Sequence, residues 1–255
     1  SLFDIVPSLL VASLTPIAYW SMSGLEGGLY AALTVWCAVR LVQESDEPNL
    51  APFSALLAAG CALTRPDGLL TLAVASGLRL LHNRQLRALA VWYSLALLPV
   101  ALHFAWRYGY YAYLLPNTFY AKVREPFRLR ELFNRRSEGW RYVIDFGERY
   151  RLLPLLGCAG LMLWPGSRWQ LRAGLLGLFA ALVFFPIYSR GDWMSEGRFL
   201  VAAVAILSAL APAALLTVSA RWHPAAPAVA CLALLALTVP VSIRRTIDRR
   251  GHYPV

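Results

Sequence analysis

Residues 199–219 read FLVAAVAILSALAPAALLTVS, an uninterrupted apolar run without a charged side chain. A helix crosses the hydrocarbon core of a membrane with about 20 such residues. Further apolar runs of near-spanning length recur from one end of the chain to the other. The sequence therefore predicts a protein that crosses a membrane several times.

The composition supports the same fold class. Hydrophobic residues make up 58% of the 255 residues, charged residues make up 15%, and the mean hydropathy is +0.53. A soluble helical protein needs polar faces on its outer helices, and the apolar runs of this chain do not provide them. We expect an all-α fold, namely a polytopic transmembrane helical bundle.

The apolar runs predict about nine membrane-crossing or membrane-embedded helices. They cover residues 5–21, 25–42, 50–64, 67–81, 88–106, 152–165, 173–189, 199–219 and 226–243. The third and fourth are divided at Pro66, because a single helix there would be about 45 Å long, against a hydrocarbon core of about 30 Å. Residues 1–243 are then a transmembrane domain, residues 107–151 its external loop with amphipathic helices, and residues 244–255 a basic external tail.

This count of spans places the connections alternately on two sides of the membrane. One side receives short, plain connections. The other receives every segment with candidate chemistry: 21–26, 65–68, 107–151, 190–198 and the tail. We therefore expect these segments to form one site.

The net charge of +10 comes from 24 Lys and Arg residues against 14 Asp and Glu residues. Nucleic acid is a poor partner, because the arginines lie between apolar spans and not along one helix face. Anionic lipid headgroups or a phosphorylated lipid substrate fit better, and arginine suits bidentate phosphate contacts. A GC-rich coding sequence is an alternative source of the arginine bias.

The orientation in the membrane stays open at this stage. The side with the candidate chemistry holds 17 of the 24 cationic residues, and the positive-inside rule would place it in the cytoplasm. A site for an anionic substrate would gather positive charge as well, so the two explanations cannot be separated by composition.

Metal and nucleotide chemistry have no signature in the sequence. The four cysteines stand singly inside apolar runs and the four histidines form no cluster, so we expect buried structural thiols and no zinc site. The chain has no Walker loop, no G-x-G-x-x-G motif and no nucleophile elbow. We expect no cofactor.

Residues 114–123 read LLPNTFYAKV and open the long polar interval of the chain. Asn117 can donate and accept hydrogen bonds, and Lys122 is a point charge suited to phosphate. Tyr113, Phe119 and Tyr120 fit an interfacial aromatic belt, but they also fit stacking on a sugar or an isoprenoid. A belt alone needs neither Asn117 nor Lys122, which favours a functional role.

Two further motifs start membrane helices. Ser23 and Glu26 match a capping box, or alternatively Glu26 is a carboxylate at the mouth of a cavity. In the motif at 64–68, Arg65 either pairs with Asp67 or binds a phosphate at the helix start.

The connection at 188–199 is short and dense in charge. Asp192 and Arg198 either pair with each other or act on a substrate. In the second interpretation, Asp192 is a base or an orienting acid and Arg198 holds a phosphate.

The motifs WSMSGLE at 20–26, LTRPDG at 63–68, YYAYLLPNTFYAKV at 110–123, and GDWM at 191–194 with RFL at 198–200 occur in this order. Together they resemble a family of bacterial integral-membrane glycosyltransferases of the GT-C class, similar to the mycobacterial terminal arabinofuranosyltransferase of the cell wall. The resemblance covers residues 20–200. It implies a polytopic enzyme of the bacterial inner membrane that uses a polyprenyl-phosphate sugar donor, with its active site on the periplasmic side.

Under this hypothesis, a hydroxyl of a cell-envelope glycan or lipid acceptor attacks the donor sugar. The candidate catalytic acids are Asp192, Glu26 and Asp67, and the candidate contacts to the donor and its phosphate are Arg65, Asn117, Tyr120, Lys122 and Arg198. Binding of a divalent cation by Glu26, Asp67 and Asp192 is an alternative.

The resemblance also predicts an acidic pair in a first external loop. Only Asp4 precedes Trp20 in this chain. The expectation is therefore that the chain lacks an N-terminal part or that the enzyme is degenerate.

Two rival hypotheses remain beside the enzyme. One is a non-catalytic membrane protein that binds or translocates an anionic lipid-linked glycan. The other is a structural subunit of an envelope assembly, for which the motifs would not share a cavity.

Overall fold

The computed structural model describes residues 5–47, 49–83, 85–113, 133–163, 169–219 and 226–250. This part of the chain is helical and contains no strand, which confirms the all-α class. The α-helices are α1 (Ile5–Ser13), α2 (Thr15–Met22), α3 (Gly27–Asp46), α4 (Phe53–Thr64), α5 (Gly68–His82), α6 (Leu86–Tyr111), α9 (Glu138–Arg149), α10 (Leu153–Gly160), α11 (Trp169–Tyr188), α12 (Val201–Ser219) and α13 (Ala226–Arg250). Two 3₁₀ helices complete the set, η2 (Leu161–Leu163) and η3 (Ser195–Leu200).

Within the described ranges, four segments are long and apolar enough to cross a membrane: Leu86–Tyr111, Trp169–Tyr188, Ser195–Leu216 and Ala226–Arg244. The pair α1 and α2 adds a fifth if its two parts are one span bent by 70°. The expected count of nine spans is therefore not confirmed, although helices occupy the predicted positions. Helices α4 and α5 have 12 and 15 residues, which reach only about 18–23 Å of a core of about 30 Å.

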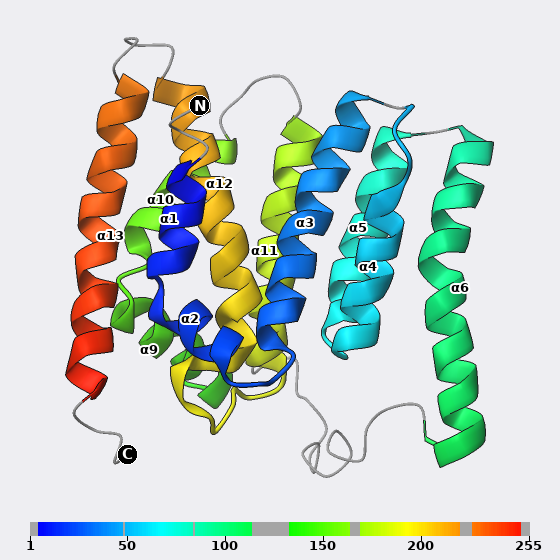
Figure 1. Cartoon of the computed structure of the whole chain (residues 1–255), viewed down its shortest axis with the longest axis horizontal. Helices are drawn as coiled ribbons and strands as arrows, with labels where there is room; N and C mark the ends of the chain where they lie inside the picture. Colours follow the sequence, from blue (N-terminus) through cyan, green and yellow to red (C-terminus); the bar gives the residue numbers. More distant parts are fainter. Residues whose placement is uncertain are drawn as a thin grey trace.

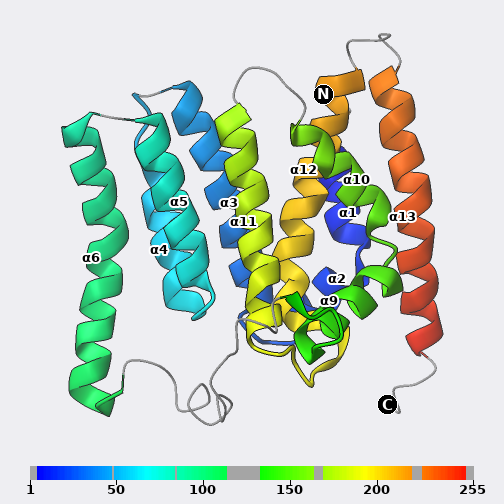
Figure 2. The same cartoon turned by 180° about the vertical axis from the view of Figure 1, so that it is seen from behind.

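The helices stand side by side in one layered bundle (Figure 1), with α13 at one edge and α6 at the other. Figure 2 shows the same order from behind, with α10 and α9 covering the rear of the half that contains α1 and α12. Helix α12 is the centre of this half, since 72% of the residues in its most apolar stretch are buried inside the protein. A helix that is apolar all round is stable only when protein or lipid surrounds it.

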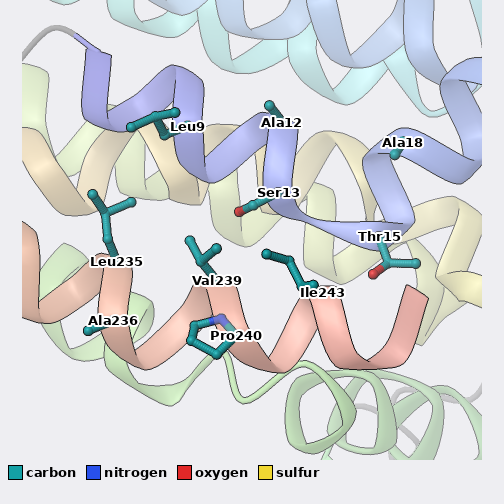
Figure 3. Close-up of a pocket in the computed structure, with 10 residues that line it drawn as sticks. All are labelled: Leu9, Ala12, Ser13, Thr15, Ala18, Leu235, Ala236, Val239, Pro240 and Ile243. Carbon is teal, nitrogen blue, oxygen red and sulfur yellow. The ribbon is translucent and has the colours of Figure 1, made fainter. Parts of the chain in front are cut away.

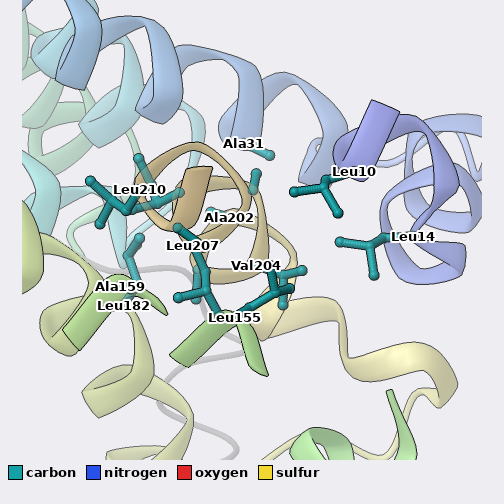
Figure 4. Packing of buried hydrophobic residues seen from close by; sticks show 14 of the residues in the cluster. Leu10, Leu14, Ala31, Leu155, Ala159, Leu182, Ala202, Val204, Leu207 and Leu210 are labelled. Carbon is teal, nitrogen blue, oxygen red and sulfur yellow. The ribbon is translucent and has the colours of Figure 1, made fainter. Parts of the chain in front are cut away.

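Side chains from several helices surround α12, and Figure 4 shows part of this packing. Leu207 and Leu210 of α12 belong to one buried cluster with Leu14, the residue between α1 and α2, and with residues of α1, α3, α10 and α11, among them Leu10, Ala31, Leu155, Ala159 and Leu182. Packing of this density fixes the positions of the helix ends, and therefore of the connections at those ends.

The tight turn between α4 and α5 confirms the predicted division at Pro66. Helix α4 ends at Thr64 and α5 begins at Gly68. A β-carbon on Gly68 would overlap the carbonyl oxygen of Cys61, so only glycine allows the two helices to approach this closely.

The motif-bearing connections lie at one end of the bundle, as predicted. Figure 1 shows the α2–α3, α4–α5 and α11–α12 connections at the end where α9 lies, and the α3–α4 and α5–α6 connections at the opposite end. Helix α9 is an amphipathic helix of the kind expected within the loop 107–151. It buries Phe146 and exposes Arg141, Asp145 and Glu148.

A buried polar cluster joins four helices at the opposite end of the bundle. The Glu44 carboxylate of α3 accepts hydrogen bonds from the backbone nitrogen and the hydroxyl of Ser54, at 2.9 and 2.6 Å. Arg40 Nε and Arg79 Nη1 lie 3.7 and 3.5 Å from its two oxygens, and Trp92 of α6 donates to the Ser54 hydroxyl. Glu44 therefore holds α3, α4, α5 and α6 together.

We predict that Glu44→Gln destabilises the protein by about 3 kcal/mol, because removing one partner of a buried ion pair leaves the other charges uncompensated. Thermal unfolding of the purified protein in detergent measures the effect. The exposed Glu47→Gln is the matched control and should leave the midpoint unchanged. Equal midpoints for the two variants would show that Glu44 does not hold these helices together.

Candidate functional site

The α4–α5 turn buries a guanidinium between two carboxylates. Arg65 is 5% exposed, and its Nε donates to Asp67 Oδ1 at 2.8 Å. Its Nη1 donates to Glu26 Oε1 of the α2–α3 connection at 3.1 Å. Arg65 thus pairs with Asp67, as the simpler interpretation proposed, and also ties together two connections 39 residues apart in sequence.

Glu26 serves this ion pair and does not form a capping box. The Ser23 hydroxyl donates to the carbonyl oxygen of Trp20 at 2.9 Å. Glu26 is itself the N-cap residue of α3 and makes no side-chain cap hydrogen bond. The capping-box interpretation was therefore wrong, because α3 begins after Glu26 and the carboxylate turns toward Arg65.

The α11–α12 connection contains the second ion pair. Arg198 Nε lies 2.9 Å from Asp192 Oδ2, and the Asp192 side chain is fully buried while that of Arg198 is 16% exposed. Two consecutive residues, Glu196 and Gly197, have φ of 61° and 60°. This left-handed pair reverses the chain between Asp192 and Arg198, which allows them to meet.

Phe199 brings the two ion pairs together. The Arg65 and Arg198 guanidinium carbons lie 5.2 and 5.0 Å from the centre of its ring, within the range of cation–π attraction. Trp20 of α2 adds a further contact to the α11–α12 connection. Its indole nitrogen donates to the carbonyl oxygen of Glu196 at 3.1 Å, and its ring lies 6.0 Å from Arg198. Three connections far apart in sequence therefore form one cluster.

The structure thus brings together five of the predicted site residues: Glu26, Arg65, Asp67, Asp192 and Arg198. The other three, Asn117, Tyr120 and Lys122, lie outside the described residues.

Helix α9 closes the cluster on one side. A β-carbon on Gly139 would overlap the backbone of Ile187, and one on Gly191 would lie 3.0 Å from the Tyr142 side chain. The amphipathic helix therefore packs directly onto the end of α11 and the connection that follows it. This packing places the Tyr142 phenol near Phe199, Asp192 and Arg198.

The electrostatics of the cluster fix the protonation of two groups. Burial raises the pKa of the Tyr142 phenol above its ordinary value, and the Asp192 charge raises it further. Burial alone lowers the pKa of Arg65, but Asp67 and Glu26 outweigh this effect and the pKa is raised. Tyr142 therefore remains a hydrogen-bond donor and Arg65 a cation at neutral pH.

Several polar groups of the cluster are available to a ligand. Asp192 occupies only the Nε edge of Arg198, and no carboxylate of the described residues pairs with the terminal nitrogens of Arg198. Both oxygens of the buried Asp192 carboxylate lack a hydrogen-bond partner in the described part of the chain, although Oδ2 lies in ion-pair range of Arg198. The Glu26 side chain is 39% exposed. The cluster can thus offer a planar cation and a carboxylate to a polar ligand.

Charge balance limits what Arg65 can do. In the cluster, the two guanidinium groups of Arg65 and Arg198 face the three carboxylates of Glu26, Asp67 and Asp192. Arg65 uses its Nε and Nη1 groups for carboxylates and is almost fully buried. Its position suits orienting Glu26 better than binding phosphate.

Among the described residues, no group of three His, Cys, Asp or Glu side chains is arranged to hold a metal ion.

An apolar groove of about 780 Å³ lies between α1, α2 and α13 (Figure 3). Leu9, Leu235, Val239 and Ile243 point into it. The hydroxyls at its edge are satisfied internally, because Ser13 donates to Leu10 and Thr15 donates to Ser242. The groove runs between α1 and α13 and reaches Thr15 and Ala18 in α2. Trp20, whose ring contacts Arg198, lies in the same helix.

Sequence reasoning gave no role to Phe199, Trp20 or Tyr142. Phe199 and Trp20 stood inside the quoted motifs, and an aromatic residue directly beside a charged motif was the available signal. Tyr142 had no such signal, because its position depends on how α9 packs on the bundle.

We predict that Gly197→Ala disrupts this cluster. The β-carbon of the new alanine would overlap the Phe146 ring, and the φ of 60° at this position strains any residue other than glycine. The α11–α12 connection and α9 must therefore move apart. Gly147→Ala is the matched control, since that glycine lies in α9 with open space around it, and alanine favours a helix over glycine by up to about 1 kcal/mol. Thermal unfolding should show a loss of stability for the first variant only, and equal midpoints would contradict the packing of α9.

Comparison of the chain with protein-family models, with curated proteins and with solved structures finds no match.

Proposed function

We propose that the protein is a membrane glycosyltransferase that moves a sugar from a polyprenyl-phosphate donor to a cell-envelope glycan or lipid. The observation that carries the proposal is the junction at Phe199, at one end of an apolar bundle. The Phe199 ring contacts the partly exposed Arg198 and also Arg65, which pairs with the partly exposed Glu26. Transfer from such a donor requires a cation for the leaving phosphate and a base for the acceptor hydroxyl.

Arg198 is the proposed contact to the leaving phosphate. Its terminal nitrogens form the bidentate donor pair that matches phosphate oxygens. Asp192, fully buried on the Nε edge, holds the guanidinium in place. Arg198 then stabilises the negative charge that grows on the phosphate as the glycosidic bond breaks. Lys122, Asn117 and Tyr120 remain proposed donor contacts on the strength of the sequence motif alone.

Glu26 is the proposed base. It is the most exposed of the three acids in the cluster, and Arg65 orients it. The acceptor oxygen attacks the anomeric carbon, and its proton passes to the Glu26 carboxylate. The bond between the anomeric carbon and the phosphate oxygen breaks, and its electron pair leaves with the polyprenyl phosphate. Asp67, which is 3% exposed, positions Arg65.

The groove beside α2 supports a lipid-linked donor. Its lining is apolar, it lies in the part of the bundle that contains α13 and the break between α1 and α2, and α2 leads from it to the phosphate site. An isoprenoid chain in this groove would bring its phosphate toward Arg198. The resemblance of the motifs to GT-C enzymes supports the bacterial inner membrane as the location and the periplasm as the side of the site.

The test uses the purified full chain with radiolabelled polyprenyl-phosphate sugars, beginning with arabinofuranose, and a membrane fraction as the source of acceptor. We predict that Glu26→Gln lowers the transfer rate about 10²–10⁴-fold, the usual contribution of a general base, and leaves donor affinity unchanged. Arg198→Gln should weaken both transfer and donor binding. Arg135→Gln, which removes an exposed charge outside the cluster, is the control and should retain full activity.

The outcomes separate the enzyme from its rival. A binding or translocating protein would show no transfer in the wild type, and Glu26→Gln would change only the affinity for the lipid-linked sugar. If the wild-type protein binds none of the polyprenyl-phosphate sugars, both functions are contradicted.

A further inference from the structure

A second apolar cavity lies at the opposite end of the bundle from the Phe199 cluster. Its volume is about 290 Å³, and it is bounded by α3, α11, α12 and η2. Its lining is apolar apart from Arg172, and it includes Val35, Val39 and Val42 of α3 and Ala209 of α12. The proposed transfer reaction uses no residue of this cavity.

The cavity is a slot elongated along α3 and α12. Its lining extends from Val42 to Val35 along α3 and from Ala213 to Ile206 along α12. Seven residues of helix correspond to about 10 Å of depth. Val39 is 45% exposed, and Ala213 is exposed as well. The slot therefore opens sideways, toward the hydrocarbon that surrounds the bundle, and admits a chain from the membrane.

Arg172 is the one cation that lines the slot in the described part of the chain. It lies in the first turn of α11, next to Trp169, which is 63% exposed. Tryptophan prefers the level of the lipid headgroups, so Trp169 places this turn at the membrane surface. No carboxylate of the described residues pairs with Arg172.

An unpaired arginine beside hydrocarbon is costly unless an anion compensates it. An anionic lipid headgroup provides that charge at the membrane surface, and its phosphate matches the planar guanidinium. The same lipid has an acyl chain directly below its headgroup, where the slot begins. A neutral lipid would fill the slot equally well but would leave Arg172 uncompensated.

From this juxtaposition we infer that α3, α11 and α12 form a binding site for an anionic phospholipid in the leaflet opposite to the candidate active site. Arg172 binds the headgroup phosphate, and the upper part of one acyl chain occupies the slot. This site is independent of the proposed glycosyl transfer.

Native mass spectrometry of the purified protein, loaded with equal amounts of phosphatidylglycerol and phosphatidylcholine of the same acyl chains, tests the inference. Wild type should retain about five times more phosphatidylglycerol than phosphatidylcholine, because the attraction of one arginine to an anionic lipid corresponds to about that factor in binding. Arg172→Gln should remove this preference, and Ala209→Phe, which fills the slot, should lower the retention of both lipids. Arg87→Gln, an exposed arginine at the start of α6 at the same end of the bundle, should keep the preference.

Equal retention of the two lipids by the wild type overturns the inference without any variant. It is also overturned if Arg87→Gln lowers the preference as much as Arg172→Gln, because the effect then belongs to the general surface charge. Unchanged lipid retention by a correctly folded Ala209→Phe variant would show that the slot holds no lipid chain.

Discussion

The buried Arg65 guanidinium is the charge on which the motif-bearing end of the bundle depends. A cation removed from water must find compensating charge, and Arg65 finds it in Asp67 on its own turn and Glu26 on another connection. Phe199 then joins this ion pair to Arg198 and Asp192. The positions of the α2–α3, α4–α5 and α11–α12 connections follow from satisfying these few charges.

The same constraint explains how the rest of the bundle is built. Apolar helices such as α12 can be surrounded by protein or lipid without further requirement, but every charge must lie at a helix end or be paired. Glu44 and its two arginines meet this requirement at one end, and the Phe199 cluster meets it at the other. The two clusters differ in access. Glu44 is 2% exposed and locks four helices, whereas Arg198 and Glu26 retain exposed atoms that a substrate can reach.

The helical class, the positions of the helices and the division at Pro66 could be predicted from the sequence, because apolar runs and a proline act locally. The number of spans could not, since α4 and α5 are too short to cross alone and their role depends on their neighbours. Five of the predicted site residues meet because each stands at a helix end on the same side. Their partners were less predictable: Glu26 looked like a cap from its spacing, and Tyr142 enters the cluster only through the packing of α9.

The claim that the three connections form one anion-binding site is tested most directly by a double-mutant cycle. The affinity for a polyprenyl monophosphate would be measured for wild type, Arg65→Gln, Arg198→Gln and the double variant. Because both guanidinium groups contact the Phe199 ring, the two substitutions should show a coupling energy of at least about 1 kcal/mol, even though only Arg198 binds the phosphate in this account. Effects that add within about 0.5 kcal/mol, or an absence of binding by the wild type, would contradict the account.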